Sequence, residues 1–352
     1  MFERYISIDD VCAWPNLTLL PDGTIVAAIF NNPSHLLAEG DMDCWASVDG
    51  GRSWRKRGTA IPHEPGTARA NVAAGLAHNS DLVVLCSGWG YVPTMRDRRL
   101  PPWVSRSSDG GVTWKVDRSK EAIRLPPGSD YEDRGALMVK PFGDIVRLPG
   151  GRLAATFYHD RGTVWVLFSA DDGRTWTESA VLSGACRGET AILRLGADRW
   201  LAASRTEADA TGVTPDVGME LFASADEGRT WTDEGPLTGP QQHPGHLLLL
   251  QDGRVLCTYG MRDAKAIGTR LGDAEGRNWK MPRVLVRLET DEGDLGYPST
   301  VQLGDGTLVT AYYADQIAQH ARYHMGVVRW TVEGDGMRVE KRVNGAASNY
   351  RG

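Results

Sequence analysis

Two residues of this sequence suggest chemistry, a glutamate and a tyrosine that each begin an apolar segment. Glu189 opens the segment "GETAILRL", and Tyr297 stands in "DLGYPSTVQL". A tyrosine whose proton is taken by an adjacent carboxylate is a nucleophile or a base at neutral pH. A carboxylate at the start of an apolar segment is costly unless it is paired or functional. The alternatives are an ion pair between Glu189 and Arg205 and a purely structural aromatic plug at Tyr297.

Two arginines are placed to bind an anionic or hydroxyl group. Arg205 ends the segment "LGADRWLAASR", and Arg262 stands in "TYGMRDAKAIGTR". A planar guanidinium binds a carboxylate through two parallel hydrogen bonds, which lysine does not do. We therefore expect both to bind substrate, and the alternative for each is a structural ion pair.

A proton donor is expected in the segment "NNPSHLLAEGD", which offers three candidates. Any of His35, Glu39 and Asp41 could be this donor, because a protonated carboxyl or imidazole group can protonate a leaving group. The alternative is a solvated loop. Further side chains expected to bind substrate are Arg69, Trp14, Asn16, His159, Asp160 and Tyr259.

This mixture of residue types also indicates the kind of ligand. Arginines, histidines, carboxylates and aromatic rings together suit a polar sugar or an acidic small molecule, through charge-assisted hydrogen bonds and flat stacking faces. His159, His243 and His246 have no metal-ligand spacing. Neither a metal nor a cofactor is expected.

The elements that must position these residues are repeated. The pattern Ser-x-Asp-x-Gly-x-Ser/Thr-Trp occurs as "SVDGGRSW", "SSDGGVTW", "SADDGRTW" and "SADEGRTW", at Ser47 to Trp54, Ser107 to Trp114, Ser169 to Trp176 and Ser224 to Trp231. It predicts a hairpin turn in which Asp accepts turn amides, Gly supplies positive φ and Trp packs on the next strand. A fifth copy, "GDAEGRNW", keeps the Gly and Trp but has Ala274 where the Asp stands.

A second series of hairpin signals precedes these turns and gives the architecture. Segments such as "LLPDGTIVAAIF" and "LGDGTLVTAYY" occur six times, two of them in weaker form. Each unit then reads as four short strands, so we predict an all-β protein, a single six-bladed β-propeller domain over residues 1–352. The outer strand of the last unit comes from "MRVEKRV" (Met337 to Val343) or from "ERYISI" (Glu3 to Ile8), which would close the ring.

This topology places the candidate residues on one face. Starts of first strands, ends of second strands and the loops after them all lie opposite the tight turns. They carry Glu189, Tyr297, both arginines and the segment with His35 and Asp41. Binding residues belong on a face with long, irregular loops.

Composition excludes several function classes. The chain of 352 residues has 39 basic and 45 acidic side chains, a net charge of −6, which does not favour nucleic-acid binding. No apolar stretch reaches the roughly 18 residues of a membrane span, and no signal peptide is seen, so we expect no membrane partner and a cytoplasmic protein. No nucleotide-binding, zinc-protease or serine-hydrolase motif is present. The cysteines are expected to be buried free thiols: Cys12, Cys44, Cys86, Cys186 and Cys257.

The four Asp-bearing turns and six units resemble the Asp-box (BNR) repeat proteins of the sialidase (neuraminidase) superfamily over essentially the whole chain. "GETAILRLGADRWLAASR" is similar to the family strand pair that carries the assisting Glu and a substrate-binding Arg, here Glu189 and Arg205. "LGYPSTVQLGDGTLVTAYY" is similar to the segment that begins with the nucleophilic Tyr, here Tyr297.

The sequence departs from the family pattern in the first unit. Where sialidases carry an Arg-Ile-Pro segment, this sequence has Trp14, Pro15 and Asn16. The resemblance places Arg262 as the last arginine of the family's triad, with Lys265 and Arg270 as rivals.

The resemblance and the residues together predict an exo-acting glycoside hydrolase that removes a terminal, acidic sugar from a carbohydrate substrate. Glu189 would deprotonate Tyr297, and Asp41 or His35 would protonate the leaving oxygen. One alternative is a polysaccharide lyase on uronate-containing glycans, with a His or Tyr base. Another is a glycan-binding propeller without catalysis. The sequence makes no prediction of sugar, linkage or oligomeric state.

Overall fold

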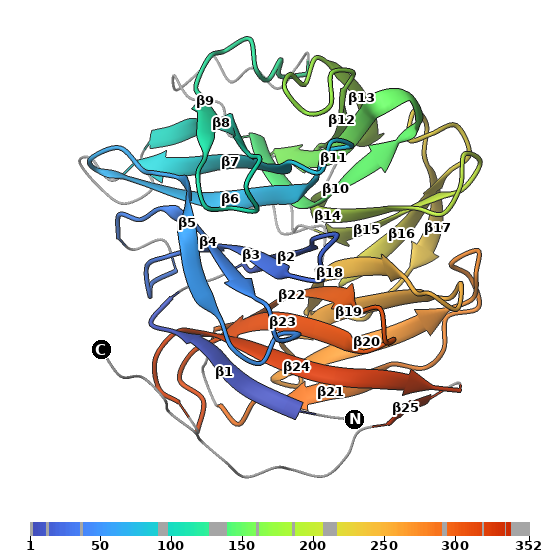
Figure 1. The fold of residues 1–352 in the computed structure, drawn as a ribbon. Helices are drawn as coiled ribbons and strands as arrows, with labels where there is room; N and C mark the ends of the chain where they lie inside the picture. Colours follow the sequence, from blue (N-terminus) through green and yellow to red (C-terminus); the bar gives the residue numbers. More distant parts are fainter. Residues whose placement is uncertain are drawn as a thin grey trace.

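The computed structural model describes residues 3–11, 14–35, 38–90, 98–126, 139–159, 162–184, 187–206, 217–290, 294–318, 320–334 and 336–338. These residues form an all-β fold whose regular structure is strand apart from a 3-10 turn at Pro149–Gly151 (Figure 1). Within these ranges, no helix has the length and hydropathy that a membrane crossing requires.

The strands form five sheets. Three have four antiparallel strands each, in the orders β2-β3-β4-β5, β14-β15-β16-β17 and β18-β19-β20-β21. Their bounds are β2 Asn16–Leu19, β3 Ile25–Phe30, β4 Met42–Ser47, β5 Arg55–Ile61, β14 Arg187–Arg194, β15 Trp200–Thr206, β16 Met219–Ser224, β17 Thr232–Pro236, β18 Gln242–Leu249, β19 Val255–Met261, β20 Ala266–Gly272 and β21 Arg283–Arg287.

The fourth sheet has eight strands, in the order β13-β12-β11-β10-β6-β7-β8-β9. It consists of two antiparallel runs of four, joined where β10 pairs in parallel with β6 over two residues only. The bounds are β6 Thr67–Leu76, β7 Leu82–Gly90, β8 Arg98–Ser107, β9 Lys115–Asp117, β10 Val139–Leu148, β11 Arg152–His159, β12 Val164–Ser169 and β13 Glu178–Ser183.

The fifth sheet joins the two ends of the chain. Its strands β22 (Leu295–Gln302), β23 (Leu308–Ala314) and β24 (His324–Glu333) are followed by β1 (Glu3–Asp9) from the other end. β1 pairs antiparallel with β24 from Glu3 opposite Arg329 to Asp9 opposite His324. Of the two predicted outer strands, "ERYISI" therefore pairs along β24. The other, "MRVEKRV", is described only as far as Arg338: β25 (Gly336–Arg338) pairs with Thr331 to Glu333 at the end of β24, and residues 339–343 lie outside the described residues.

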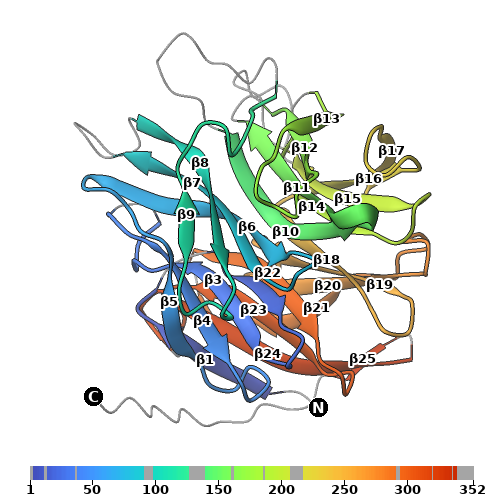
Figure 2. The same cartoon turned by 45° about the horizontal axis from the view of Figure 1, so that its top comes forward.

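The first strands of the units are neighbours in a cyclic order. β2 contacts β6, β6 contacts β10, and the contacts continue through β14 and β18 to β22, which contacts β2 again. These strands lie towards the centre in both ribbon views, with later strands further out (Figures 1 and 2). Buried clusters fill the spaces between neighbouring sheets, as where Leu256 and Ile267 meet Leu308 and Tyr312. The starts of the central strands are thereby held close together.

The Asp-bearing turns have the predicted hydrogen bonds. In the first, the Asp49 carboxylate accepts the amides of Arg52 (3.1 Å) and Ser53 (2.9 Å). Gly51 has φ +91°, and the indole of Trp54 donates to its carbonyl oxygen at 3.1 Å. Equivalent carboxylate contacts occur in the other three copies, at Asp109, Asp171 and Asp226.

The fifth turn has a carboxylate although Ala274 stands at the Asp position. Asp273, one residue before Ala274, supplies the carboxylate and accepts the amide of Arg277 at 2.7 Å and the side-chain amide of Asn278 at 2.6 Å. A carboxylate shifted by one residue reaches the same turn because the loop bends around it.

Three of the five cysteines fit the sequence prediction. Cys44, Cys86 and Cys257 are buried free thiols, and burial raises the pKa of each to about 12. Cys12 and Cys186 lie outside the described residues.

Candidate functional site

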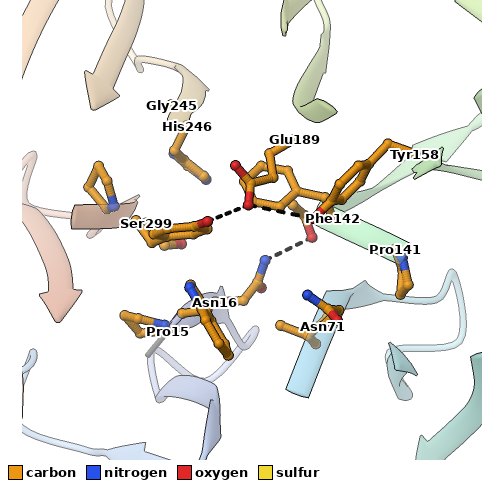
Figure 3. A pocket seen from close by; sticks show the side chains of 15 residues that line it. Pro15, Asn16, Asn71, Pro141, Phe142, Tyr158, Glu189, Gly245, His246 and Ser299 are labelled. Atoms are coloured by element: carbon orange, nitrogen blue, oxygen red, sulfur yellow. Dashed lines mark hydrogen bonds between the residues drawn. The ribbon is translucent and has the colours of Figure 1, made fainter. Parts of the chain in front are cut away.

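A small cavity lies among the central strands. Its volume is about 40 Å³, and its lining includes residues of six central strands or of the segment just before one: Trp14 and Asn16 (β2), Asn71 (β6), Phe142 (β10), Glu189 (β14), His246 (β18) and Tyr297 (β22). Figure 3 shows Asn16, Asn71, Phe142, Glu189 and His246 converging from separate ribbons. Residues distant in sequence therefore meet at one point.

Glu189 and Tyr297 are in direct contact in this cavity. The phenol of Tyr297 donates a hydrogen bond to Oε1 of Glu189. Arg205 donates to the other oxygen, Oε2, at 2.7 Å, and Tyr158 donates to Oε1 at 3.5 Å. The ion pair and the Tyr–Glu pair, which were alternatives in the sequence, are present together.

The surroundings of this pair shift the pKa values of its two groups in opposite directions. Burial alone raises the pKa of Glu189, but the charge of Arg205 and the hydrogen bonds from Tyr297 and Arg205 outweigh it and lower the pKa to about 2. Burial, and then the charge of Glu189, raise the pKa of Tyr297 well above its ordinary value. At neutral pH the pair is a carboxylate that accepts a hydrogen bond from a neutral phenol.

Irregular backbone turns these side chains into the cavity. In β22 the register with β23 shifts between Gly296 and Ser299, and Tyr297 has φ +48°. In β14 the register with β15 shifts between Arg187 and Thr190, across Glu189. Bulges re-aim side chains next to functional sites, and a non-glycine residue at positive φ costs of order 1 kcal/mol.

Arg262 lies against the same tyrosine. Its guanidinium carbon is 5.8 Å from the centre of the Tyr297 ring, and its charge acts on Glu189 and on Asp294. Among the described carboxylates none forms an ion pair with Arg262. A half-buried guanidinium beside the cavity is suited to an anionic group of a ligand.

Trp14 forms an aromatic wall of the site. Its ring centre lies 5.8 Å from that of Tyr297 and 5.1 Å from that of His35. Phe142 approaches Tyr297 from another side at 6.2 Å. Trp14 also has positive φ, +67°, so its placement depends on irregular backbone as well.

His35 has a partner that the sequence reasoning did not single out. Its Nδ1 is hydrogen-bonded to Oδ2 of Asp294. Tyr313 donates to Asp294 at 2.6 Å, and Tyr323 does so at 3.2 Å. The sequence signal that could have identified Asp294 is its position three residues before Tyr297 in "DLGYP", directly before the strand that carries Tyr297.

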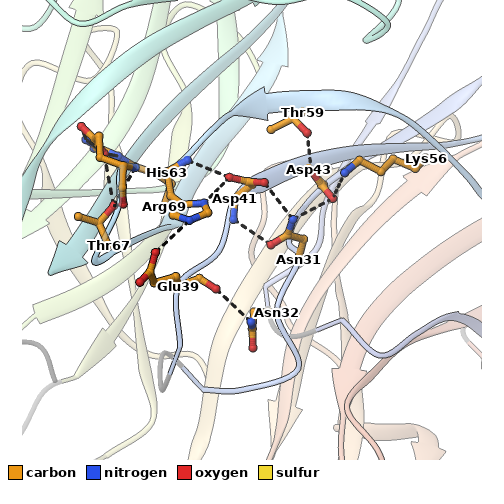
Figure 4. A network of polar contacts seen from close by, with 11 residues as sticks. Asn31, Asn32, Glu39, Asp41, Asp43, Lys56, Thr59, His63, Thr67 and Arg69 are labelled. Carbon is orange, nitrogen blue, oxygen red and sulfur yellow. Dashed lines mark hydrogen bonds and ion pairs between the residues drawn. The ribbon is translucent and has the colours of Figure 1, made fainter. Parts of the chain in front are cut away.

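Asp41 lies in a different network (Figure 4). Its carboxylate accepts the amide of His63 at 2.8 Å and contacts the His63 ring at 2.6 Å, and Asn31 also donates to it. The other side of the His63 ring faces Glu39 at 3.3 Å. Burial raises the pKa of Asp41, but the hydrogen bonds from His63 outweigh it, so the net shift is downward and Asp41 stays ionised.

Three predicted binding residues are occupied by protein contacts. Arg69, 1% exposed, pairs with Glu64 at 3.1 Å and stacks on Trp103 at 3.3 Å. Tyr259 is completely buried in a hydrophobic cluster, so it touches no ligand in this conformation. His159 is buried, and its ring centre is 6.1 Å from that of Trp165, with the two rings nearly perpendicular.

Asn16 lines the cavity and donates to the carbonyl oxygen of Gly143 at 2.8 Å. Asp160 lies outside the described residues. Lys140, which the sequence reasoning missed, has its ammonium 4.6 Å from the Tyr158 ring centre. Nothing in its local sequence marks it, because only the pairing of β10 with β11 places it there.

No group of three or more metal-ligating side chains occurs in the part of the chain that the structure describes. The groups that the site does bring together are suited to nucleophilic and acid–base chemistry: a phenol with a carboxylate acceptor, two guanidinium groups and a histidine–aspartate pair.

Comparison with known protein families matches residues 23–310 to the BNR repeat-like domain. The chain belongs to the BNR repeat-like family. No curated protein matches it by sequence. The family places the chain in the sialidase/BNR-type superfamily, as its repeated turns predicted.

Solved structures support the fold of this BNR repeat-like protein. A protein of unknown function from Dyadobacter fermentans is 21% identical, with a TM-score of 0.78 over 93% of this chain and 97% of that one. Trypanosoma rangeli sialidase is 16% identical, with a TM-score of 0.66, over 92% of this chain and 55% of that one. The NanB sialidase of Streptococcus pneumoniae is 12% identical, with a TM-score of 0.66, over 92% of this chain and 68% of that one. The chain thus spans little more than half to two thirds of these sialidases.

Proposed function

We propose that this BNR repeat-like protein is a single six-bladed β-propeller domain that acts as an exo-glycoside hydrolase. The cyclic order of the central strands and the pairing of β1 with β24 support a closed ring of six four-stranded blades. The sialidases among its structural neighbours support a carbohydrate substrate.

The observation that carries the proposed reaction is the hydrogen bond from Tyr297 to Glu189. As the phenol oxygen of Tyr297 attacks the anomeric carbon, its proton passes to Glu189. Because Glu189 is ionised, it can accept that proton. The phenol therefore loses its proton while its oxygen bonds the anomeric carbon, and no free phenolate is required beforehand. Water then displaces Tyr297 from the anomeric carbon, and the proton returns from Glu189 to the phenol oxygen. Two successive displacements retain the configuration of that carbon.

The leaving oxygen needs a proton, and the first loop offers Asp41 and His35 as its donor. Arg205 and Arg262 bind the anionic or hydroxyl groups of the sugar. Arg262, which has no ion-pair partner among the described carboxylates, is the group that favours an acidic sugar.

The proposal is tested with purified protein and chromogenic terminal glycosides that include sialosides, uronides and deoxy sugars. We expect aglycone release with at least one of them and a loss of about 1,000-fold or more in Tyr297→Phe. Tyr312→Phe is the matched control, because Tyr312 is buried on β23 and bonded to Arg4 away from the cavity. Turnover that survives in Tyr297→Phe would refute the proposed nucleophile.

A lyase is the second candidate, and the pairing of His35 with Asp294 is the observation that favours it. In a lyase, the histidine would remove a proton beside a uronate carboxylate that Arg262 neutralises. Its product carries a double bond that absorbs in the ultraviolet, whereas hydrolysis makes none. Recording absorbance beside aglycone release therefore separates the two reactions.

A further inference from the structure

His35 and Asp294 come from opposite ends of the chain and meet at the site. His35 belongs to the segment between β3 and β4, and Asp294 directly precedes β22. Nδ1 of the imidazole is hydrogen-bonded to Oδ2 of the carboxylate. A carboxylate bonded to one ring nitrogen fixes the tautomer of a histidine.

Asp294 is held rigidly. Tyr313 donates to its Oδ1 at 2.6 Å, Tyr323 donates to Oδ2 at 3.2 Å, and its own backbone amide donates to Asp315 at 2.5 Å. Burial raises the pKa of Asp294, but the hydrogen bond and charge of His35 outweigh it and lower the pKa. Asp294 is thus a fixed anion beside the imidazole of His35.

His35 is separated from Tyr297 by the ring of Trp14. Its ring centre is 5.1 Å from that of Trp14, which in turn lies 5.8 Å from that of Tyr297. The centre of the Tyr313 ring, whose hydroxyl donates to Asp294, is 5.7 Å from that of Tyr297. The His35 side chain is 37% exposed, so it is accessible from solvent.

The other histidine–carboxylate pair lacks this connection. Among the described residues, neither His63 nor Asp41 has a hydrogen bond or ring contact with Tyr297, Glu189 or Trp14. Their contacts are with each other, with Asn31 and with Glu39.

We propose that His35 is the acid/base residue of the glycosidase and that Asp294 is its positioning residue; this inference rests on the proposed function. In the first step Nε2–H of His35 gives its proton to the glycosidic oxygen, whose bond to the anomeric carbon breaks. The bond from Tyr297 to that carbon forms, and the phenol proton moves to Glu189. In the second step water gives its proton to His35, its oxygen bonds the anomeric carbon, and Tyr297 leaves and recovers its proton from Glu189.

The test compares two substrates of the same sugar with different leaving groups. Phenol needs protonation on departure, and 2,4-dinitrophenol does not. We expect His35→Gln to lose about 100-fold or more in kcat/KM for glycosylation with the phenyl glycoside and less than about 10-fold with the dinitrophenyl glycoside. Asp294→Asn is expected to show the same selective loss to a smaller extent, because it acts through His35.

His63→Gln serves as the matched control, and we expect its ratio of the two rates to equal that of the parent. His35 is partly exposed, so its variant is expected to fold, and thermal unfolding verifies both site variants. Equal losses with both leaving groups would overturn the inference, and so would a selective loss in His63→Gln. A parent protein without turnover would refute the proposed function and this inference with it. A parent with turnover that depends on Tyr297 but not on His35 would refute the inference alone.

Discussion

Glu189 receives hydrogen bonds on both carboxylate oxygens, from Tyr297 and Tyr158 on one and from Arg205 on the other. With 6% exposure, it depends on Arg205 for its charge compensation. These contacts allow one buried carboxylate to accept a hydrogen bond from the phenol of Tyr297 and still be a stable part of the fold. A substitution that removes one of these hydrogen bonds is therefore expected to change both the stability of the fold and the proposed reaction.

Removing Arg205 leaves that carboxylate buried without its counter-charge. We expect Arg205→Met to lower the free energy of unfolding by about 3–5 kcal/mol, measured by urea denaturation. Arg229→Met removes a solvent-exposed pair with Glu178 and should cost no more than about 1 kcal/mol. Equal losses in the two variants would contradict the account, and adding Glu189→Gln to Arg205→Met should recover part of the loss.

The lowered pKa of Glu189 also sets a pH dependence. Because the pKa falls from 4.5 to about 2 on folding, the unfolded state binds the proton more readily. The stabilisation is full above about pH 4.5 and is lost as the pH falls towards 2. The difference in thermal stability between the parent and Glu189→Gln should therefore shrink over that interval. A difference that stays constant, or that grows in acid, would argue against an ionised Glu189.

Sequence reasoning located Glu189, Tyr297 and Arg205 because each occupies an end of a predicted strand, and strand ends of one polarity share a face. It did not find Asp294, since the contact with His35 depends on where a loop folds. Tyr259 was misjudged in a different way. It stands at the end of a strand, but its side chain points into the core, which strand position alone does not decide.

At the scale of the element, the turns repeat and the bulges differ. Each Asp-bearing turn binds its own amides through one carboxylate, so it is specified locally and could be predicted from eight residues. The register shifts at Tyr297 and Glu189 have no such sequence signature. These register shifts depend on packing between neighbouring strands. The sequence therefore predicted the strands but not the shifts that orient the side chains of Tyr297 and Glu189.

The turn carboxylates are expected to contribute measurably to stability. Asp109 accepts backbone amides from Val112 and Thr113 and hydroxyls from Ser107 and Thr113. Asp109→Ala should lower the free energy of unfolding by about 1–3 kcal/mol. Asp22→Ala, which removes a contact to the single amide of Thr24, is the comparison and should cost less. Indistinguishable urea midpoints would show that the turn hydrogen bonds are not what stabilises this motif.

At the scale of the whole molecule, β1 joins the end of the chain to its beginning. The strand pairs along β24, and Ile8 is buried in a cluster with residues of both the first and the last sheet. The sequence predicted this strand only as one of two alternatives, because either candidate could pair with β24. In the assembled sheet both segments pair with β24, β1 opposite His324 to Arg329 and β25 opposite Thr331 to Glu333.

Truncation of residues 1–9 should therefore destabilise the entire fold. We expect the melting temperature to fall by roughly 10 °C or more, measured by calorimetry. Truncation after Gly334 removes β25, which pairs with three residues of β24, and should have a much smaller effect. If both truncations melt at the parent temperature, ring closure by β1 contributes little.

The most direct test of the central claim is the mass of a trapped intermediate. The protein is incubated with a fluorinated inactivator of the sugar found with the chromogenic panel, and the labelled peptide is sequenced by mass spectrometry. A hydrolase with Tyr297 as its nucleophile predicts one glycosyl group, on Tyr297, and none in Tyr297→Phe. A glycosyl group on another residue, or continued turnover with an unlabelled protein, would contradict it.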